Sequence, residues 1–154
     1  MNTANIMQWA DIERIKVGDT ASCDFLVDAQ AVQTFADLSM DDNALHMDAA
    51  VAESCGFPKR VAHGMLALSM ISRLIGTQLP GHGSLWSSEE LRFVTPVFVG
   101  DTLTARVTVE QVSRGAEMVK LKTEVNNNST GAVVISGTAM VKVPRRRTKE
   151  GKPA

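Results

Sequence analysis

The segment VAHGMLALSMISRLIGTQLPG, residues 61–81, is the one around which we expect the rest of the chain to pack. From Met65 to Leu79, apolar residues cover most of the circumference of a helix, and Arg73 is the only charged residue. A helix that is apolar nearly all round is a buried helix, and Pro80-Gly81 provides a stop signal. At 1.5 Å per residue it spans about 22 Å, too short to cross a bilayer.

The sequence after this helix changes to the two-residue period of β-strands. Apolar and polar residues alternate at 91–93, 103–109, 119–125 and 133–143, with turn residues at 96–101 and 126–131. Long strands joined by short turns predict an antiparallel sheet with one face in need of cover. The apolar helix supplies that cover, which gives an α+β layer with segregated elements. A long central helix wrapped by one curved antiparallel sheet is the hot-dog fold.

The sequence before the helix predicts three shorter elements. We expect a strand at 21–27, a helix from Asp28 to Leu38 and a short helix at about 48–54, with a polar segment at 39–46. The Asp28 side chain can accept hydrogen bonds from the free amides of the first turn, which makes it a suitable N-cap.

The composition is that of one soluble globular domain. The 154 residues are 44% hydrophobic and 21% charged, ordinary values for a chain with a single core. No segment resembles a signal peptide or a membrane span of about 18 apolar residues, so we expect a cytoplasmic protein. Cys23 and Cys55 lack metal-type spacing and are expected to be reduced.

The net charge of −1 is distributed unevenly. Residues 145–154, RRRTKEGKPA, carry five positive charges and one negative charge, so the remaining residues have a net charge of −5. A mildly acidic body argues against a nucleic-acid-binding protein. We predict one domain over residues 1–144 and a basic, disordered tail over 145–154.

Polar residues that can carry chemistry gather just before the central helix. Asp41, Asn43 and His46 lie in the segment DDNALH, and His63 and Gly64 begin the helix. A loop rich in Asp, Asn and His is often only a turn and a cap, and composition leaves that interpretation open. Asp and His are also metal ligands, but no H-x-x-x-H or equivalent spacing occurs. We therefore predict no metal site.

The same segments resemble the MaoC-like family of (R)-specific enoyl-CoA hydratases. Its pattern is D-x-N-x-apolar-H followed by a helix that opens with His-Gly, as in DDNALH at 41–46 and HGM at 63–65. LRF at 91–93 and PVFVGD at 96–101 resemble the family's strand and turn, and the match runs from about Ile12 to Val143. Ala44 stands where many members carry Pro, a departure that removes no reactive group. The resemblance implies an acyl-CoA substrate, fatty-acid or polyhydroxyalkanoate metabolism, and a homodimer with its sheets side by side.

Hydration of a conjugated enoyl thioester requires a base for the water, an acid for the alpha carbon and donors for the thioester oxygen. Asp41 and His46 are five residues apart, so a bend in the loop can bring both to one water molecule. We assign Asp41 as general base and His46 as general acid, with the roles exchanged in dehydration. Asn43 would orient the water or hold Asp41. One shared water delivers both hydrogens to the same face, which is a syn addition.

Gly64 is the predicted oxyanion hole, because its amide lies at a helix N-terminus and no side chain blocks the approach of an oxygen. In the alternative interpretation, Gly64 only permits a tight start to the helix. His63 is interpreted as a residue that begins the helix, not as a catalyst, and is grouped with the substrate contacts. The resemblance implies that Ser72 and Ile75 face the acyl chain, whereas otherwise they are core positions.

We therefore predict a hydratase that converts trans-2-enoyl-CoA to (R)-3-hydroxyacyl-CoA with no metal or organic cofactor. One alternative is an acyl-CoA thioesterase on the same fold, which would attack the thioester carbonyl and release CoA. The other is a non-catalytic module that binds acyl thioesters, against which the presence of both Asp41 and His46 argues.

Overall fold

The structure is a computed structural model that describes residues 9–145 of the chain. Within these residues, one strand is followed by four helices and then by four longer strands. In chain order they are β1 (Thr20–Leu26), α1 (Ala29–Ser39), α2 (Ala44–Met47), α3 (Ala49–Ser54), α4 (Gly64–Thr77), β2 (Leu85–Phe93), β3 (Thr102–Ser113), β4 (Met118–Asn127) and β5 (Val133–Lys142).

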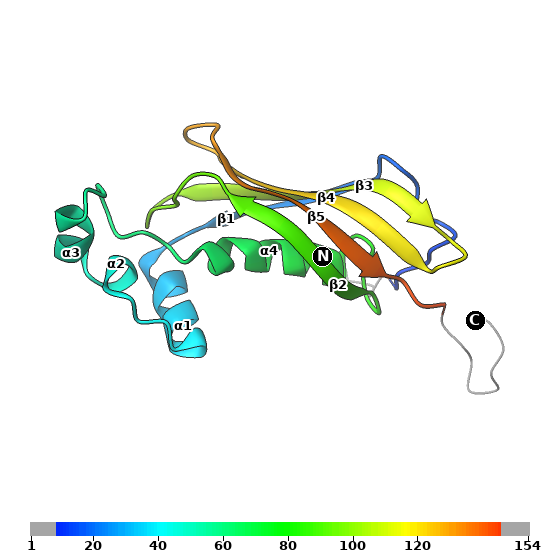
Figure 1. Cartoon of the computed structure of the whole chain (residues 1–154), viewed down its shortest axis with the longest axis horizontal. Coiled ribbons are helices and arrows are strands. Elements are labelled where there is room, and N and C mark those ends of the chain that lie inside the picture. The colour runs from blue at the N-terminus through cyan, green and yellow to red at the C-terminus, as the bar shows by residue number, and fades with distance from the viewer. Residues whose placement is uncertain (1–8, 146–154) are drawn as a thin grey trace, which may run out of the picture.

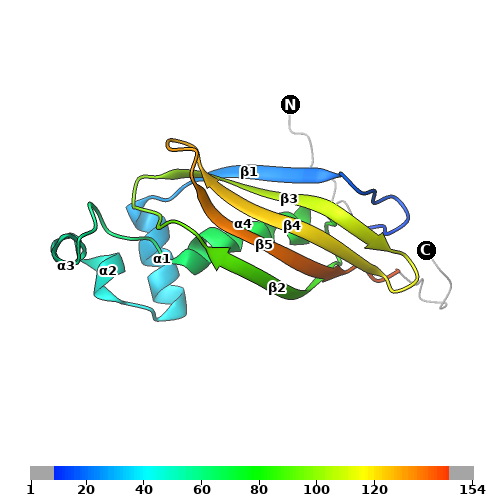
Figure 2. The same ribbon diagram turned by 45° about the horizontal axis from the view of Figure 1, so that its top comes forward.

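The five strands form one antiparallel sheet in the order β1-β3-β4-β5-β2 (Figure 2). Helix α4 runs along one face of this sheet, and α1, α2 and α3 lie together beyond one end of it (Figure 1). This arrangement confirms the predicted hot-dog fold. It also places the N-terminus of α4 at the end of the sheet where the three short helices gather.

The core lies between α4 and the sheet because alternate strand residues point toward the helix. Residues on this face of β3 and β4 are almost fully buried, as are four apolar residues of α4. The largest of these side chains are Ile71, Leu74, Ile75, Leu103 and Leu121.

One side of α4 departs from the expected all-round burial. Met65 is 55% exposed, and Ser72 and Arg73 are exposed as well. The sheet covers only one face of the helix, so the prediction of a helix buried on every side is wrong for a single chain. The exposed side is continuous with apolar residues on β2, where Leu85 is 62% exposed and Phe93 is 53% exposed.

Three boundaries also differ from the predicted ones. The segment expected to be a loop at 39–46 contains the one-turn helix α2, because Asn43 caps it by accepting a hydrogen bond from the Leu45 N–H at 3.1 Å. Strand β4 continues through Asn127, which was expected in a turn. Strand β2 begins at Leu85, and a register shift at Trp86/Ser88 interrupts the alternation that would have indicated it.

The predicted N-cap of the first helix is confirmed, since Asp28 Oδ1 accepts from the Ala31 N–H at 2.7 Å. Of the predicted tail, residues 146–154 lie outside the described residues. Arg145 is described, and it forms ion pairs with Glu13 at 2.8 Å and with Glu117 at 3.4 Å. Within residues 9–145, the helices are too short or too polar to cross a bilayer.

Edge strand β2 directs one carboxylate toward the core. Trp86 Nε1–H donates to Glu89 Oε2 at 3.2 Å, and the buried Thr123 hydroxyl donates to Glu89 Oε1. Gly137 leaves the space that this carboxylate occupies, because a Cβ there would collide with it. Burial raises the pKa of Glu89 above its usual range, while the two hydrogen bonds act in the opposite direction. Because of the Glu89 carboxylate, the side chains of edge strand β2 are not all apolar.

Candidate active site

Asp41 is placed by the turn that ends α1. Met40 adopts the left-handed conformation, φ 57° and ψ 25°, and this reverses the chain after Ser39. A non-glycine residue in this region costs about 1 kcal/mol, so the turn needs support from its neighbours. The Asn43 N–H donates to Asp41 Oδ1 at 3.3 Å. The Asp41 carboxylate is thus held by the main chain in front of α2, with its side chain 53% exposed.

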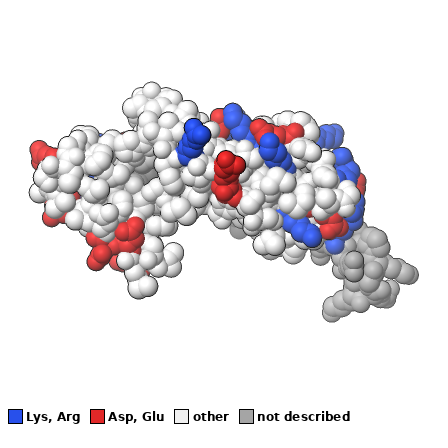
Figure 3. Space-filling model, in the orientation of Figure 1, with Lys and Arg blue, Asp and Glu red and all other residues white. Residues whose placement is uncertain are grey.

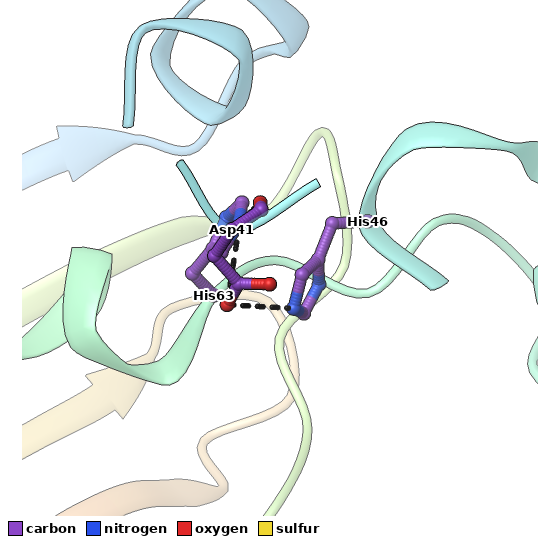
Figure 4. Close-up of side chains that lie close together, drawn as sticks. All are labelled: Asp41, His46 and His63. Atoms are coloured by element: carbon purple, nitrogen blue, oxygen red, sulfur yellow. Dashed lines mark hydrogen bonds and ion pairs between the residues drawn. The ribbon is translucent and has the colours of Figure 1, made fainter. Parts of the chain in front are cut away.

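His46 lies on α2 and faces Asp41 (Figure 4). Its Nδ1 is 2.7 Å from the carbonyl oxygen of Val61. Because a carbonyl only accepts, Nδ1 carries the hydrogen of this bond, and Nε2 is left as the nitrogen available for proton transfer. His46 Nε2 is 3.9 Å from Asp41 Oδ2. The loop and α2 therefore bring the predicted base and acid together.

The distance between these two atoms suits a shared water molecule. At 3.9 Å, Asp41 Oδ2 and His46 Nε2 are too far apart for a good direct hydrogen bond. A water oxygen about 2.8 Å from each would bond both, with an angle of about 90° at the oxygen. The His46 side chain is 14% exposed and that of Asp41 is 53% exposed, so solvent can reach the space between them.

His63 lies behind the Asp41–His46 pair, where its side chain is only 2% exposed. Its Nε2 is 2.9 Å from the main-chain carbonyl oxygen of Asp41 and 4.0 Å from Oδ2 of the same residue. Its ring packs on the ring of His46, with centroids 3.8 Å apart and planes 35° apart, and on Phe35 at 5.0 Å. Sequence reasoning missed these contacts, because residue type and spacing gave no signal for them.

Gly64, the first residue of α4, lines a cavity of about 430 Å³ together with His46. Among residues 9–145 the Gly64 N–H has no hydrogen-bond partner. A Cβ at this position would lie 2.7 Å from Cε1 of Phe93. The Phe93 ring on β2 can therefore pack this close only because residue 64 is a glycine. The other residues that line the cavity are Val61, Ala62, Met65, Phe93, Val94, Thr95, Pro96, Val97 and Val134.

The remaining predicted site residues lie at different distances from this cavity. Asn43 is next to Asp41, but it holds Asp41 through its main-chain N–H while its side chain caps α2. Ser72 is exposed and Ile75 is 2% exposed, eight and eleven residues beyond Gly64 along α4. At 1.5 Å per residue these positions are about 12 and 16 Å from the glycine. Of the predicted site residues, only His46 and Gly64 line the cavity; Asp41, Asn43, His63, Ser72 and Ile75 do not.

Asp41, His46 and His63 also form a group whose ligand atoms lie within 4.8 Å of one another. The geometry does not suit a metal ion, since ligands must direct their lone pairs at one point. The two imidazole rings pack on each other with their planes 35° apart, and Nε2 of His63 donates to a carbonyl. The arrangement favours hydrogen bonding and proton transfer.

The charge around the site is acidic. No Lys or Arg occurs between residues 17 and 58, a range that includes α1, α2 and α3. Figure 3 shows acidic residues at the end that holds these helices, while most of the visible Lys and Arg lie over the sheet. The nearest cations along the chain from the Asp41–His46 segment are Lys59 and Arg60, and Arg60 Nη1–H donates to the Met47 carbonyl at 3.4 Å.

With this geometry in view, comparison with known proteins assigns the family. Residues 14–132 match the family described as MaoC like domain. The protein belongs to the MaoC-like family. The resemblance inferred from the segments at 41–46 and 63–65 is therefore confirmed.

Relatives of this MaoC-like protein match it over most of their own length. It is 40% identical to an (R)-specific enoyl-CoA hydratase of Rhodospirillum rubrum over 134 residues, covering 87% of this chain and 92% of the relative. It is 39% identical to an (R)-specific enoyl-CoA hydratase of Aeromonas caviae, covering 86% and 98%. A solved (R)-hydratase from A. caviae, described as involved in PHA biosynthesis, superimposes with a TM-score of 0.82 at 39% identity, covering 86% and 99%.

Proposed function

We propose that this MaoC-like protein is an (R)-specific enoyl-CoA hydratase, which adds water to trans-2-enoyl-CoA and forms (R)-3-hydroxyacyl-CoA. One observation carries the proposal: Asp41 Oδ2 and His46 Nε2 lie 3.9 Å apart, beside a cavity that His46 lines together with Gly64, whose N–H has no hydrogen-bond partner among residues 9–145. Relatives at 39–40% identity bear this activity in their names.

The reaction follows from the shared water. Asp41 takes one proton from the water as its oxygen bonds to the beta carbon, and His46 delivers a proton from Nε2 to the alpha carbon. The proton held by Asp41 then returns to His46 through solvent at the 3.9 Å gap, which restores both groups. Because the two groups lie on one side of the bound water, hydrogen and hydroxyl add to the same face of the double bond.

Negative charge develops on the thioester oxygen as the water adds, and the Gly64 N–H is the proposed donor to it. The amide is at the first position of the 14-residue helix α4, where the helix dipole favours negative charge. A preorganised donor of this kind contributes about 3 kcal/mol in the transition state.

The acyl chain is proposed to extend from Gly64 along the exposed side of α4 toward Ser72, whereas Ile75 is 2% exposed and packs in the core of this chain. Ser72 would then help to set the length of the acyl chain, while His63 stays enclosed behind the Asp41–His46 pair. Lys59 and Arg60 are available for the CoA phosphates. The proposal includes fatty-acid or PHA metabolism as the setting, and the cytoplasmic location stays a prediction from the sequence.

The test of the function is an assay of the purified protein with enoyl-CoA substrates of several chain lengths. We expect loss of the enoyl-thioester absorbance and, by chiral analysis, only the (R)-3-hydroxyacyl product. A thiol reagent run in parallel reports CoA release. Free thiol from a saturated acyl-CoA without change in enoyl absorbance would instead identify a thioesterase, and binding with neither reaction would identify a non-catalytic module.

We further propose a homodimer in which two copies join along β2. On the described chain β2 pairs only with β5, and the free edge is flanked by Leu85, Phe93 and the exposed Met65 of α4. A second copy would extend the sheet and cover the open side of the helix, completing the acyl-binding side of the site.

Light scattering at micromolar concentration is expected to give twice the chain mass of 16.6 kDa. Leu85→Lys should shift the protein toward the monomer, because it places a charge at the proposed interface. Val17→Lys is the matched control, since Val17 is 65% exposed in the turn before β1 and should leave the dimer intact. A wild-type monomer would contradict the proposal.

Gly64→Ala is expected to reduce kcat about 100-fold. The added methyl would lie 2.7 Å from Cε1 of Phe93, so the ring must move into the cavity and obstruct the amide. Circular dichroism should show a folded protein, because alanine is favoured over glycine in a helix. Adding Phe93→Leu should restore part of the activity, whereas an unchanged kcat in Gly64→Ala alone would contradict this prediction, because it would show that the Phe93 ring does not obstruct the amide.

A further inference from the structure

We propose that His63 is a positioning residue, which holds the Asp41 main chain so that the carboxylate stays opposite His46. This role rests on the proposed hydratase function, and it assigns His63 to the geometry of the acid–base pair, not to substrate contact. The feature that carries it is a buried side-chain hydrogen bond from the start of α4 to the loop that bears the base.

The hydrogen bond has a defined direction. His63 Nε2 lies 2.9 Å from the carbonyl oxygen of Asp41, and since that oxygen only accepts, Nε2 carries the hydrogen. The Nε2–H of His63 is therefore used by the Asp41 carbonyl. The same nitrogen is 4.0 Å from Asp41 Oδ2, which leaves the carboxylate free for other partners. His63 holds the backbone of the base without occupying its reactive oxygens.

The loop needs this hydrogen bond, because little else holds it. Met40 occupies the left-handed region and is 86% exposed, so it adds no packing at the bend. The two local bonds at Asp41, from its own N–H to Ser39 Oγ and from the Asn43 N–H to Oδ1, are both 3.3 Å long. The hydrogen bond from His63 is shorter, at 2.9 Å. Of these three hydrogen bonds, it is the one that connects Asp41 to the start of α4.

The ring also provides a fixed wall for the acid. His46 packs against it at 3.8 Å, and Phe35 of α1 packs on it at 5.0 Å. One buried ring thus joins α1, the Asp41 loop, α2 and α4, as the labelled side chains in Figure 4 illustrate for the last three. The distance between Asp41 Oδ2 and His46 Nε2 depends on this common contact.

Two simpler roles do not account for the residue. His63 precedes α4 as its N-cap, but its side chain makes no capping hydrogen bond, so helix initiation does not require an imidazole. Its side chain is 2% exposed, whereas that of Asp41 is 53% exposed, and Nδ1 has no partner among the described residues. A group enclosed in this way is not arranged to reach substrate.

The two features of the side chain can be separated by substitution. His63→Gln keeps an N–H donor at about the reach of Nε2 and removes the ring, whereas His63→Phe keeps a ring and removes the donor. Because a displacement of about 1 Å costs about 100-fold in rate, we expect kcat to fall about 100-fold in His63→Phe with KM within about threefold. We expect His63→Gln to recover all but about fivefold of the wild-type kcat. Should the larger Phe prevent folding, His63→Leu supplies the variant without a donor.

A second readout does not depend on catalysis. Amide hydrogen exchange at Asn43, whose N–H donates to Asp41 Oδ1, reports whether the loop is held. Exchange should be faster in His63→Phe or His63→Leu and close to wild type in His63→Gln. This result, with the kcat difference, would support the positioning role.

Equal kcat and equal exchange in the variants with and without a donor would overturn it. If the wild-type protein failed to hydrate enoyl-CoA, the proposed function would fail instead. The exchange measurement would still decide whether His63 holds the Asp41 loop.

Discussion

Asp41→Asn is expected to lower kcat for hydration by about 1,000-fold while substrate binding stays within about threefold of wild type. The amide has the shape of the carboxylate and can still accept from the Asn43 N–H, so the loop geometry is retained. It cannot take a proton from water. Stopped-flow loss of enoyl absorbance measures the rate, and calorimetric titration with a saturated acyl-CoA measures binding.

Asp42→Asn is the matched control for this substitution. It removes one negative charge at the adjacent exposed position, and no hydrogen bond or ion pair of the Asp42 side chain occurs within residues 9–145. We expect its kcat to remain within about twofold of wild type. If Asp41→Asn were equally mild, Asp41 would not be the base, and the assignment of the water-activating group would have to be abandoned.

His46→Asn is the second substitution with a large expected effect, again about 1,000-fold in kcat. The asparagine amide lies near the former Nδ1 and can donate to the Val61 carbonyl, which keeps α2 attached to the segment before α4. Nothing replaces Nε2, so no group opposite Asp41 can deliver a proton to the alpha carbon. The same rate and binding measurements apply.

His82→Asn serves as the control for His46→Asn, because His82 lies beyond the opposite end of α4 and packs near Trp9 at 6.4 Å. Combining Asp41→Asn with His46→Asn tests whether the two groups act on one water. Residues that act as a unit are non-additive, so the double variant should be nearly as active as either single variant. Multiplied losses would indicate independent action.

The helix α4 and the sheet that it packs against could be predicted because their signals are periodic and local. An apolar helical face and alternating strands report directly which residues leave water. The N-cap at Asp28 was found for the same reason, since its partner, the Ala31 N–H, is three residues away. Helix α2 was missed because one turn is too short for a period to show, and Asn43 reads equally well as a loop residue.

The sequence by itself determined which groups can react: a carboxylate and an imidazole five residues apart, with a glycine at the start of an apolar helix. The chemical reactivity of a side chain depends on its residue type, which the sequence gives directly. A short loop also limits how far apart the residues at its two ends can lie. Only the tertiary structure decided the orientation of these groups. The Val61 carbonyl selects the free nitrogen of His46, and the His63 ring packs on Phe35 of α1 and His46 of α2. These contacts join residues at least 15 positions apart, so their geometry depends on how the helices and loops pack together.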